Sequence, residues 1–349
     1  MDDQILNIIT TEKQKNSSKN LALNKSPDSN SIQEMARKIL AEVMIYHRVP
    51  ESRNSCKTVD YHQCISPHLP KIISAVKSNQ PVTFVLPAFP GKSPNTEKVL
   101  GPLPDQAERL SLQFLHDLCQ QIKKCYSPGA KIILCSDGRV FSDVVGMNEH
   151  HVTAYQNELN RLIVEMSFSD ISTINLDDFY EGLNFIQMRD KLMICYANSL
   201  DSLKYKIRNG AESSASPDEQ EAKRMYCGIT RFLFEDALHT GQTKSRSALQ
   251  KEARFNAYEV IRRSNAWSHL IAEHFPEAVR LSIHPQTCGA KKLGIRLIGN
   301  ESWMTPWHGV ALESKKGYVL LKRSEAEALG AQLIYSSDGR PSHYKLIAA

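Results

Sequence analysis

The chain has 349 residues, of which 41% are hydrophobic, so it can bury a sizeable core in one large domain or two small ones. Its 43 Lys and Arg residues against 38 Asp and Glu give a formal net charge of only +5, and no basic run resembles a nucleic-acid-binding arm. No apolar run is long enough to span a bilayer and no signal peptide is visible, so we expect a cytoplasmic protein that binds neither nucleic acid nor membrane.

The eight cysteines are scattered and form no C-x-x-C pair. Several fall within apolar periodic segments, so we expect reduced, mostly buried thiols and no zinc or other metal site. They are Cys56, Cys64, Cys119, Cys125, Cys135, Cys195, Cys227 and Cys288.

The chain begins with a segment whose composition differs from the rest. Residues 1–30 are rich in Ser, Asn and Lys, which is typical of a disordered leader. Residues 31–47 then repeat apolar side chains at helical spacing, which predicts a helix that Ser31 could cap.

From residue 81 onward, β-forming runs alternate with amphipathic helical patterns. Asp105 and Glu108 have the spacing of a capping box, and Asn148 is placed to cap a later helix. The predicted strands are 82–86, 131–136, 171–176 and 278–285, and the predicted helices are roughly 104–126, 149–166, 184–208, 218–240 and 249–275.

This alternation predicts an α/β fold with a Rossmann-like, mainly parallel sheet and flanking helices. The C-terminal part differs, because "GVALES-KKG-YVLLKR" reads as a hairpin and "AQLIYSSDGRPSHYKLI" as a second pair of strands. We therefore expect one domain over residues 31–349, ending in a small antiparallel β portion at about 308–349.

Polar side chains follow all four predicted strands of the sheet. Ligands bind beyond the carboxyl ends of the strands in an open parallel sheet, so these side chains should converge on one site. Asp177 and Asp178 are adjacent, so only one of them should face that site from a strand end. The full set is Lys92, Ser93, Asn95 and Lys98; Ser136, Asp137, Arg139 and Asp143; Asp177 and Asp178; and Ser282, His284 and Gln286.

The loop "PAFPGKSPN" contains Gly91, Lys92 and Ser93, the last three residue types of a P-loop. Leu86 occupies the place of the first P-loop glycine, which excludes a nucleoside-triphosphate site. Free backbone N–H groups, the serine hydroxyl and the lysine ammonium could still bind one phosphate. The alternative is a surface turn with solvated lysines.

The segment "SDGRVFSD" offers a second candidate phosphate ligand. Gly138 permits a tight turn, and the Arg139 guanidinium matches phosphate oxygens with two hydrogen bonds. The alternative is a turn in which Asp137 bonds its own backbone and Arg139 pairs with a neighbouring acid. On a later helix, Arg262 and Arg263 would ordinarily extend toward water, although one of them could meet a substrate carboxylate.

Two histidines stand out by their surroundings. His284 lies at a strand end before a proline, and His308 lies in "SWMTPWHGV" with Trp303 and Trp307. Each histidine is either structural or a proton carrier near neutral pH, and the tryptophans either line an aromatic pocket or seal the core.

Four motifs in this order resemble the isocyanide (isonitrile) synthase family, over about residues 35–325. The family includes bacterial tyrosine and tryptophan isonitrile synthases and fungal enzymes of spore-wall dityrosine formation. The motifs are "LPAFPGKSPNTEKVLGPLPDQAE", "AKIILCSDGRVFSDVVGM", "RRSNAWSHLIAEHFPEAVRLSIHPQ" and "TPWHGVAL".

The resemblance implies an enzyme that joins the amino group of tyrosine or tryptophan to the keto carbon of ribulose 5-phosphate. It implies a Rossmann-like fold, no metal or organic cofactor, and a non-haem iron oxygenase as the next enzyme. Tyrosine is the preferred amino acid, because the motifs are closer to the bacterial tyrosine-type enzymes. Residues 1–30 extend beyond the family's shared region, and residues 209–220 look like a lid or an insertion.

Roles within such a reaction follow from residue chemistry. Asp137, His284 and His308 are candidates for proton transfer, and Lys92 for phosphate binding or a Schiff base with the ketose. Arg263 or Lys292 is the candidate cation for the carboxylate of the amino acid. The other candidate substrate-binding residues are Ser93, Asn95, Lys98, Arg139, Gln286 and Trp307.

Two other functions also fit the polar loops. One is a sugar-phosphate-binding protein without catalysis, which would not need paired proton donors. The other is a lyase that condenses a different ketose phosphate through lysine chemistry.

Overall fold

The computed structural model describes residues 29–49, 61–239, 241–298 and 304–347. Residues 1–28 of the predicted leader lie outside the described residues. The first described helix, α2 (Ser29–Met44), begins before Ser31, so the prediction that Ser31 caps this helix is wrong.

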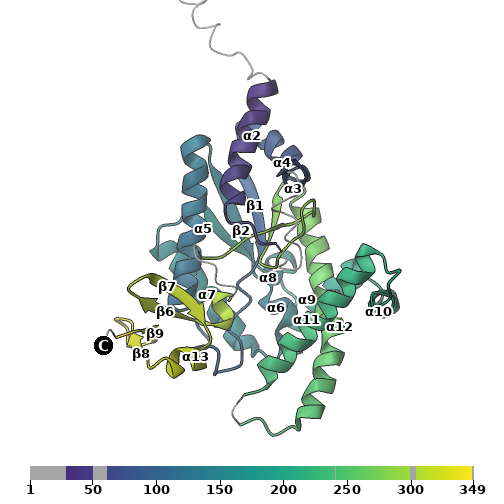
Figure 1. Cartoon of the computed structure of the whole chain (residues 1–349), viewed down its shortest axis with the longest axis vertical. Coiled ribbons are helices and arrows are strands. Elements are labelled where there is room, and N and C mark those ends of the chain that lie inside the picture. Colours follow the sequence, from purple (N-terminus) through teal and green to yellow (C-terminus); the bar gives the residue numbers. More distant parts are fainter. Residues whose placement is uncertain (1–28, 50–60, 240, 299–303, 348–349) are drawn as a thin grey trace, which may run out of the picture.

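A five-stranded sheet with every pairing parallel forms the centre of the molecule. Its order is β3-β2-β1-β4-β5, so the chain crosses over between β1 and β4, and such a crossover is where α/β sheets bind ligands. The predicted α/β class with a mainly parallel sheet is therefore confirmed (Figure 1). The strands are β1 (Val82–Pro87), β2 (Ala130–Cys135), β3 (Ile171–Ile174), β4 (Val279–Ser282) and β5 (Leu293–Gly294).

Helices cover both faces of this sheet. Successive side chains of a strand point to opposite faces, which shows which helices pack on which face. Phe84 and Leu86 point into a core shared with α2, α4, α5 and α7, whereas Val85 points into a second core shared with α6, α8, α9 and α12. The helices of the first face are α4 (Leu69–Lys77), α5 (Gln106–Cys125) and α7 (Glu149–Glu165) in addition to α2. Those of the second are α6 (Gly138–Val145), α8 (Leu176–Phe179), α9 (Phe185–Tyr196) and α12 (Arg246–His274).

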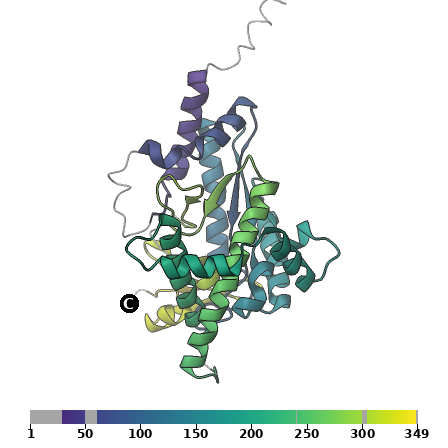
Figure 2. The ribbon, with the colours of Figure 1, turned by 90° about the vertical axis from the view of Figure 1, so that its right-hand side faces the viewer.

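A helical lobe extends from the second face. The helices α10 (Leu200–Asn209) and α11 (Pro217–Ala237) pack against α12, which is 29 residues long and continues beyond the sheet (Figures 1 and 2). Apolar side chains such as Ile207, Leu233 and Ala257 are buried between these helices. The lobe therefore forms one wall beside the carboxyl ends of the strands.

The C-terminal residues form a separate four-stranded sheet of order β7-β6-β9-β8. Both predicted strand pairs are present and antiparallel, and a parallel pairing of β6 with β9 joins them into one mixed sheet. A short 3₁₀ helix, η3 (Pro306–His308), precedes this sheet. The remaining elements are β6 (Val310–Ser314), β7 (Gly317–Leu321), α13 (Arg323–Ala328), β8 (Gln332–Tyr335) and β9 (Pro341–Lys345).

Two predicted strand-end loops are helices in the structure. The segment after β2 turns directly into α6 at Gly138, and Asp177 lies in the first turn of α8. The expectation that Asp177 and Asp178 alternate on a strand end is therefore wrong. Asp178 instead completes a capping box, because its carboxylate accepts a hydrogen bond from the N–H of Asn175.

The cysteine prediction is wrong at one pair. Cys64 of α3 (Tyr61–Ile65) and Cys288 of the β4–β5 loop form a disulfide across 224 residues of sequence. Spacing alone could not reveal this pairing, since it depends on the two segments meeting in space. Of the other described cysteines, Cys119 and Cys135 are buried as expected, while Cys195 and Cys227 are exposed.

Within the described part of the chain, no helix combines the length and apolar character that crossing a membrane would require.

Gly138 is required by a close approach between two segments. A Cβ atom at this position would lie 1.7 Å from the carbonyl oxygen of Pro90, so the β1 loop and α6 meet only because the side chain is absent. We predict that Gly138→Ala lowers stability by about 1–3 kcal/mol or more, measured by chemical denaturation. Gly101→Ala is the matched control, because nothing lies within 4 Å of its added Cβ. Equal stability of the two variants would contradict this account.

Candidate functional site

The loop that follows β1 is buried rather than exposed. Lys92, Ser93, Asn95 and Lys98 are each less than 8% exposed, so the alternative of a solvated surface turn is wrong. The backbone makes this burial possible, with Gly91 at φ 130°. The N–H of Ser93 donates to the carbonyl of Trp307 at 2.8 Å, which joins the loop to η3.

Lys92 is enclosed by two carboxylates and a carbonyl. Its Nζ lies 2.9 Å from Asp105 Oδ2 and 2.8 Å from Glu108 Oε2, and it donates to Pro306 O at 2.9 Å. Burial opposes the charge of the ammonium, but the two carboxylates outweigh that effect and raise the pKa of Lys92. Three protein oxygens lie within 2.9 Å of the ammonium, so its surroundings are those of a positioning residue.

The two carboxylates around Lys92 belong to the predicted capping box of α5. Asp105 accepts from Ala107 N, and Glu108 accepts from Asp105 N, which confirms that prediction. The Tyr155 hydroxyl donates to the second oxygen of Glu108 at 3.1 Å. Burial raises the pKa of Glu108 to about 7, so this carboxyl depends on Lys92 to remain ionised.

His308 faces a second ion pair. Lys98 binds Asp236 of α11, and the other oxygen of Asp236 lies 3.9 Å from His308 Nε2. His308 Nδ1 is 2.9 Å from the Thr305 hydroxyl, and burial lowers the pKa of this histidine to about 4. The imidazole is therefore neutral near pH 7 and can accept a proton.

Asn95 fixes the position of α11 at the same place. Its amide donates to the carbonyls of Glu235 and Leu238, on either side of Asp236. The sequence analysis missed Asp236, because "FLFEDALH" shows no signal that separates this acid from an ordinary helical one. Only the fold brings it to Lys98 and His308.

Asp137 lies at the end of β2, where it was predicted to face the site. Its carboxylate is half-buried just before α6 and bonds the backbone N–H of Asp137 itself, as one alternative predicted, while no other described residue makes a hydrogen bond or an ion pair to it. Burial raises the pKa of Asp137 to about 7. A carboxyl with this pKa can both accept and donate a proton near neutral pH.

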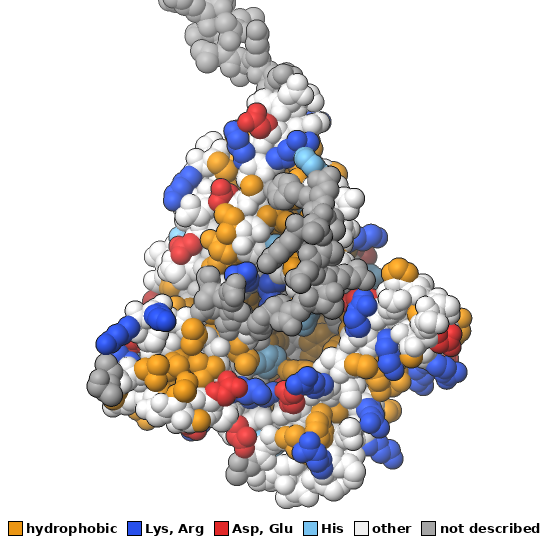
Figure 3. Space-filling model, viewed as in Figure 1, with side chains coloured by type: hydrophobic (Ala, Val, Ile, Leu, Met, Phe, Trp, Pro, Cys, Tyr) orange, Lys and Arg blue, Asp and Glu red, His pale blue; other side chains and the backbone are white. Residues whose placement is uncertain are grey.

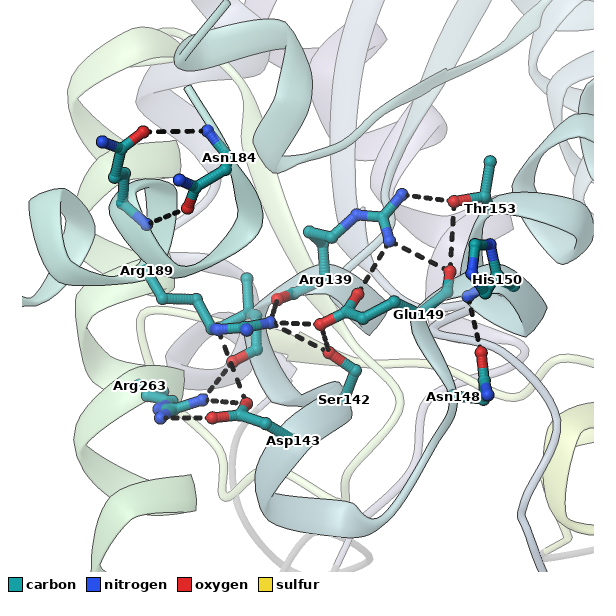
Figure 4. A network of polar contacts seen from close by, with 12 residues as sticks. Arg139, Ser142, Asp143, Asn148, Glu149, His150, Thr153, Asn184, Arg189 and Arg263 are labelled. Carbon is teal, nitrogen blue, oxygen red and sulfur yellow. Dashed lines mark hydrogen bonds and ion pairs between the residues drawn. The ribbon is translucent and has the colours of Figure 1, made fainter. Parts of the chain in front are cut away.

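Arg139 and Arg263 lie in an ion-pair network that joins helices of the second face to one another and to α7 (Figure 4). The Arg139 guanidinium lies 2.8 Å from Glu149 Oε2 and 3.3 Å from Asp177 Oδ2, and Arg263 binds both oxygens of Asp143. These contacts favour the alternative in which Arg139 pairs with neighbouring acids. Both guanidinium groups are paired with carboxylates of the protein, and substrate contacts by either of them remain a prediction.

A third arginine, which the sequence analysis missed, completes this network. Arg189 of α9 donates to Glu149 Oε1 at 2.6 Å and to the hydroxyl of Ser142 at 3.1 Å. It is buried, and it joins α9 to α6 and α7. Its position within an ordinary helical pattern gave no signal of this role.

The segment after β4 brings His284, Gln286 and Lys292 to the same edge. His284 is partly open to solvent. Desolvation by the surrounding protein, followed by the charges of Arg48 and Lys292, lowers its pKa to about 4. The N–H of Gln286 donates to Arg48 O, and a Cβ at Gly294 would lie 3.0 Å from its nitrogen. Gly294 therefore allows this loop to fold back over the sheet.

The tryptophans do not form a pair in the described structure. Trp307 is buried with its ring 5.4 Å from that of Phe89, which supports sealing of the core, and Trp303 lies outside the described residues. On the face shown in Figure 3, histidine and basic side chains appear around a hollow between the C-terminal sheet and the helical lobe. Among the described residues, no group of three His, Cys, Asp or Glu side chains could hold a metal ion.

The burial of Lys92 generates a prediction about stability and pH. Lys92→Met leaves two buried carboxylates without a cation, so it should cost about 3–5 kcal/mol at pH 7. Without the ammonium, the folded-state pKa values of the carboxyls exceed the unfolded ones. The folded variant then binds more protons, so its stability falls as pH rises and partly recovers toward pH 5.

Denaturation across this pH range measures the effect. Lys345→Met is the control, because Lys345 pairs with Glu313 at the surface, and it should change stability little. If Lys92→Met kept full stability and lost only substrate affinity, Lys92 would be a ligand and not a positioning residue.

Comparisons with known proteins agree with the fold and identify the family. Residues 72–334 match the family described as "Pyoverdine/dityrosine biosynthesis protein". An L-tyrosine isonitrile synthase of Pseudomonas aeruginosa is 45% identical over 89% of this chain and 94% of its own length. An L-tryptophan isonitrile synthase of Fischerella ambigua is 41% identical over 89% of this chain and 95% of its own. The crystal structure of the PvcA protein from Pseudomonas aeruginosa aligns with a TM-score of 0.82 and 42% identity, over 90% of this chain and all of that one.

Proposed function

We propose that this chain, which belongs to the pyoverdine/dityrosine biosynthesis protein family and is an isonitrile synthase, uses L-tyrosine and ribulose 5-phosphate as its substrates. The observation that carries the proposal is the near-complete length over which synthases named for tyrosine and for tryptophan match this chain. L-tryptophan is the second candidate amino acid. A cytoplasmic location and a non-haem iron oxygenase that takes up the product are further parts of the proposal.

The first chemical step requires groups that move protons at neutral pH. The amino nitrogen attacks the keto carbon, the C–N bond forms, and one water leaves as the imine is made. The nitrogen loses protons and the departing oxygen gains them. Asp137, with a pKa of about 7, is suited to both transfers.

His308 and His284 supply two neutral imidazoles that lie near enough for His284 to lower the pKa of His308. The low pKa of each, about 4, makes it a proton acceptor and not a resident cation at neutral pH. Thr305 is within hydrogen-bond distance of one ring nitrogen of His308 and Asp236 faces the other, so we assign both residues positioning roles. Lys92 and Asn95 support this arrangement by fixing η3 and α11.

A labelling experiment tests the proposed substrates. We expect ribulose 5-phosphate carrying carbon-13 at the keto carbon, incubated with L-tyrosine, to give a product whose isonitrile carbon is labelled, as seen by mass spectrometry and NMR. If product formed only with L-tryptophan, L-tryptophan would replace L-tyrosine as the proposed amino-acid substrate. Absence of product with both amino acids, while ribulose 5-phosphate still binds, would contradict the proposal and favour a binding role.

The pKa of Asp137 leads to a prediction about pH dependence. If ionised Asp137 is the base, kcat/KM should fall about tenfold per pH unit below pH 7, and Asp137→Asn should lower kcat by about 10²- to 10⁴-fold. The residual activity of the variant should also lack this acidic limb, that is, the fall in kcat/KM below pH 7.

Asp178→Asn provides the matched control for Asp137→Asn. The carboxylate of Asp178 caps α8 by accepting a hydrogen bond from the N–H of Asn175, so this variant should keep both the rate and the pH profile. An acidic limb that persisted unchanged in Asp137→Asn would assign the base to another group.

A further inference from the structure

Arg280 and Lys292 meet at the edge where β4 pairs with β5. The two strands are parallel with Leu281 opposite Leu293, and both leucines point into the first core. Arg280 and Lys292 immediately precede these leucines, so they are neighbours on the face toward α12. Arg280 confirms this direction, because its guanidinium donates to the hydroxyl of Ser268 on α12.

Neither cation has an anionic partner in the described parts of the chain. Arg280 bonds the neutral Ser268 hydroxyl, and no described residue makes a hydrogen bond or an ion pair to the Lys292 ammonium. The other basic candidates of the site differ in this respect. Lys92, Lys98, Arg139 and Arg263 all bind carboxylates.

The charges of Arg280 and Lys292, which no described carboxylate balances, shift the pKa values of nearby groups. Burial and then the charge of Arg280 lower the pKa of Lys292 to about 8, and Arg48 and Lys292 both contribute to the low pKa of His284. Burial also lowers the pKa of Arg280. Cations held together in this way are stabilised by an anion that binds between them.

We propose that Arg280 and Lys292 form the subsite for the phosphate of the ketose phosphate, which rests on the proposed function. Two adjacent cations match a phosphate dianion better than a singly charged carboxylate. The subsite also lies on β4, one of the two strands that flank the crossover of the sheet. Among the candidate cations, this assignment uses the two without a carboxylate partner and leaves Lys92 and Arg139 to hold the fold.

The position relative to Asp137 suits a phosphate at the far end of the sugar. Burial and Asp137 raise the pKa of Cys135, while Arg280 acts on the same thiol in the opposite direction. Both groups are therefore within electrostatic reach of Cys135, whose side chain lies in the core on the α12 face, the face toward which Arg280 also points. The keto carbon of a pentulose 5-phosphate is several bonds from its phosphorus, so the phosphate must bind apart from the groups that act on that carbon.

The test measures two substrates separately in two variants. Lys292→Met and Arg280→Gln should each weaken binding of inorganic phosphate, followed by calorimetry, and raise the KM for ribulose 5-phosphate by about tenfold or more. The KM for the amino acid should change less than about twofold. Lys291→Met is the matched control, because Lys291 is the exposed neighbour of Lys292 and should leave all three values unchanged.

Other outcomes would contradict the subsite or separate it from the proposed function. A rise in the KM for the amino acid alone would mean that the subsite takes a carboxylate, and unchanged values in both variants would remove the subsite altogether. If the wild-type chain gave no isonitrile, phosphate binding that is lost in Lys292→Met would still support the subsite while the proposed function failed. Should Arg280→Gln not fold, Lys292→Met and Arg280→Lys decide the question.

Discussion

The buried ammonium of Lys92 is the contact on which the arrangement of the site depends. A charge enclosed by protein is tolerated only when partners surround it, and here the partners come from two other segments of the chain. Asp105 and Glu108 serve at once as the N-terminal cap of α5 and as the counter-charges of Lys92. The β1 loop, α5 and η3 are therefore held by one cluster, and none of them can shift without exposing an unpaired charge.

This cluster determines where His308 lies. Lys92 holds the carbonyl of Pro306, Ser93 holds that of Trp307, and the next residue is His308 itself. From the other side, Asn95 holds the carbonyls that flank Asp236. The loop that resembles part of a P-loop thus acts mainly through protein contacts, as a frame between η3 and α11.

The sequence predicted what depends on neighbours along the chain. Strand and helix periodicity gave the parallel sheet, and local spacing gave the caps at Asp105 and Asn148. It could not predict partners that meet only after folding. A capping box does not reveal that it will enclose Lys92, and Arg280 falls within a run that reads as an ordinary buried strand. The partners of Arg139 and the disulfide between Cys64 and Cys288 are likewise set by tertiary structure.

Asp137, the proposed acid–base group, is not paired with either of the nearby cations, Arg280 and Lys292. Had Arg280 bound Asp137, the opposite charge would have lowered the pKa of that carboxyl and removed its ability to exchange protons near neutral pH. Arg280 is instead turned to the Ser268 hydroxyl, and burial keeps the pKa of Asp137 at about 7. An anion bound beside Arg280 would bring a further negative charge toward Asp137, and a like charge raises the pKa of a carboxyl. Occupation of the subsite would thus favour the protonated carboxyl, which is the form that can deliver a proton to the departing oxygen.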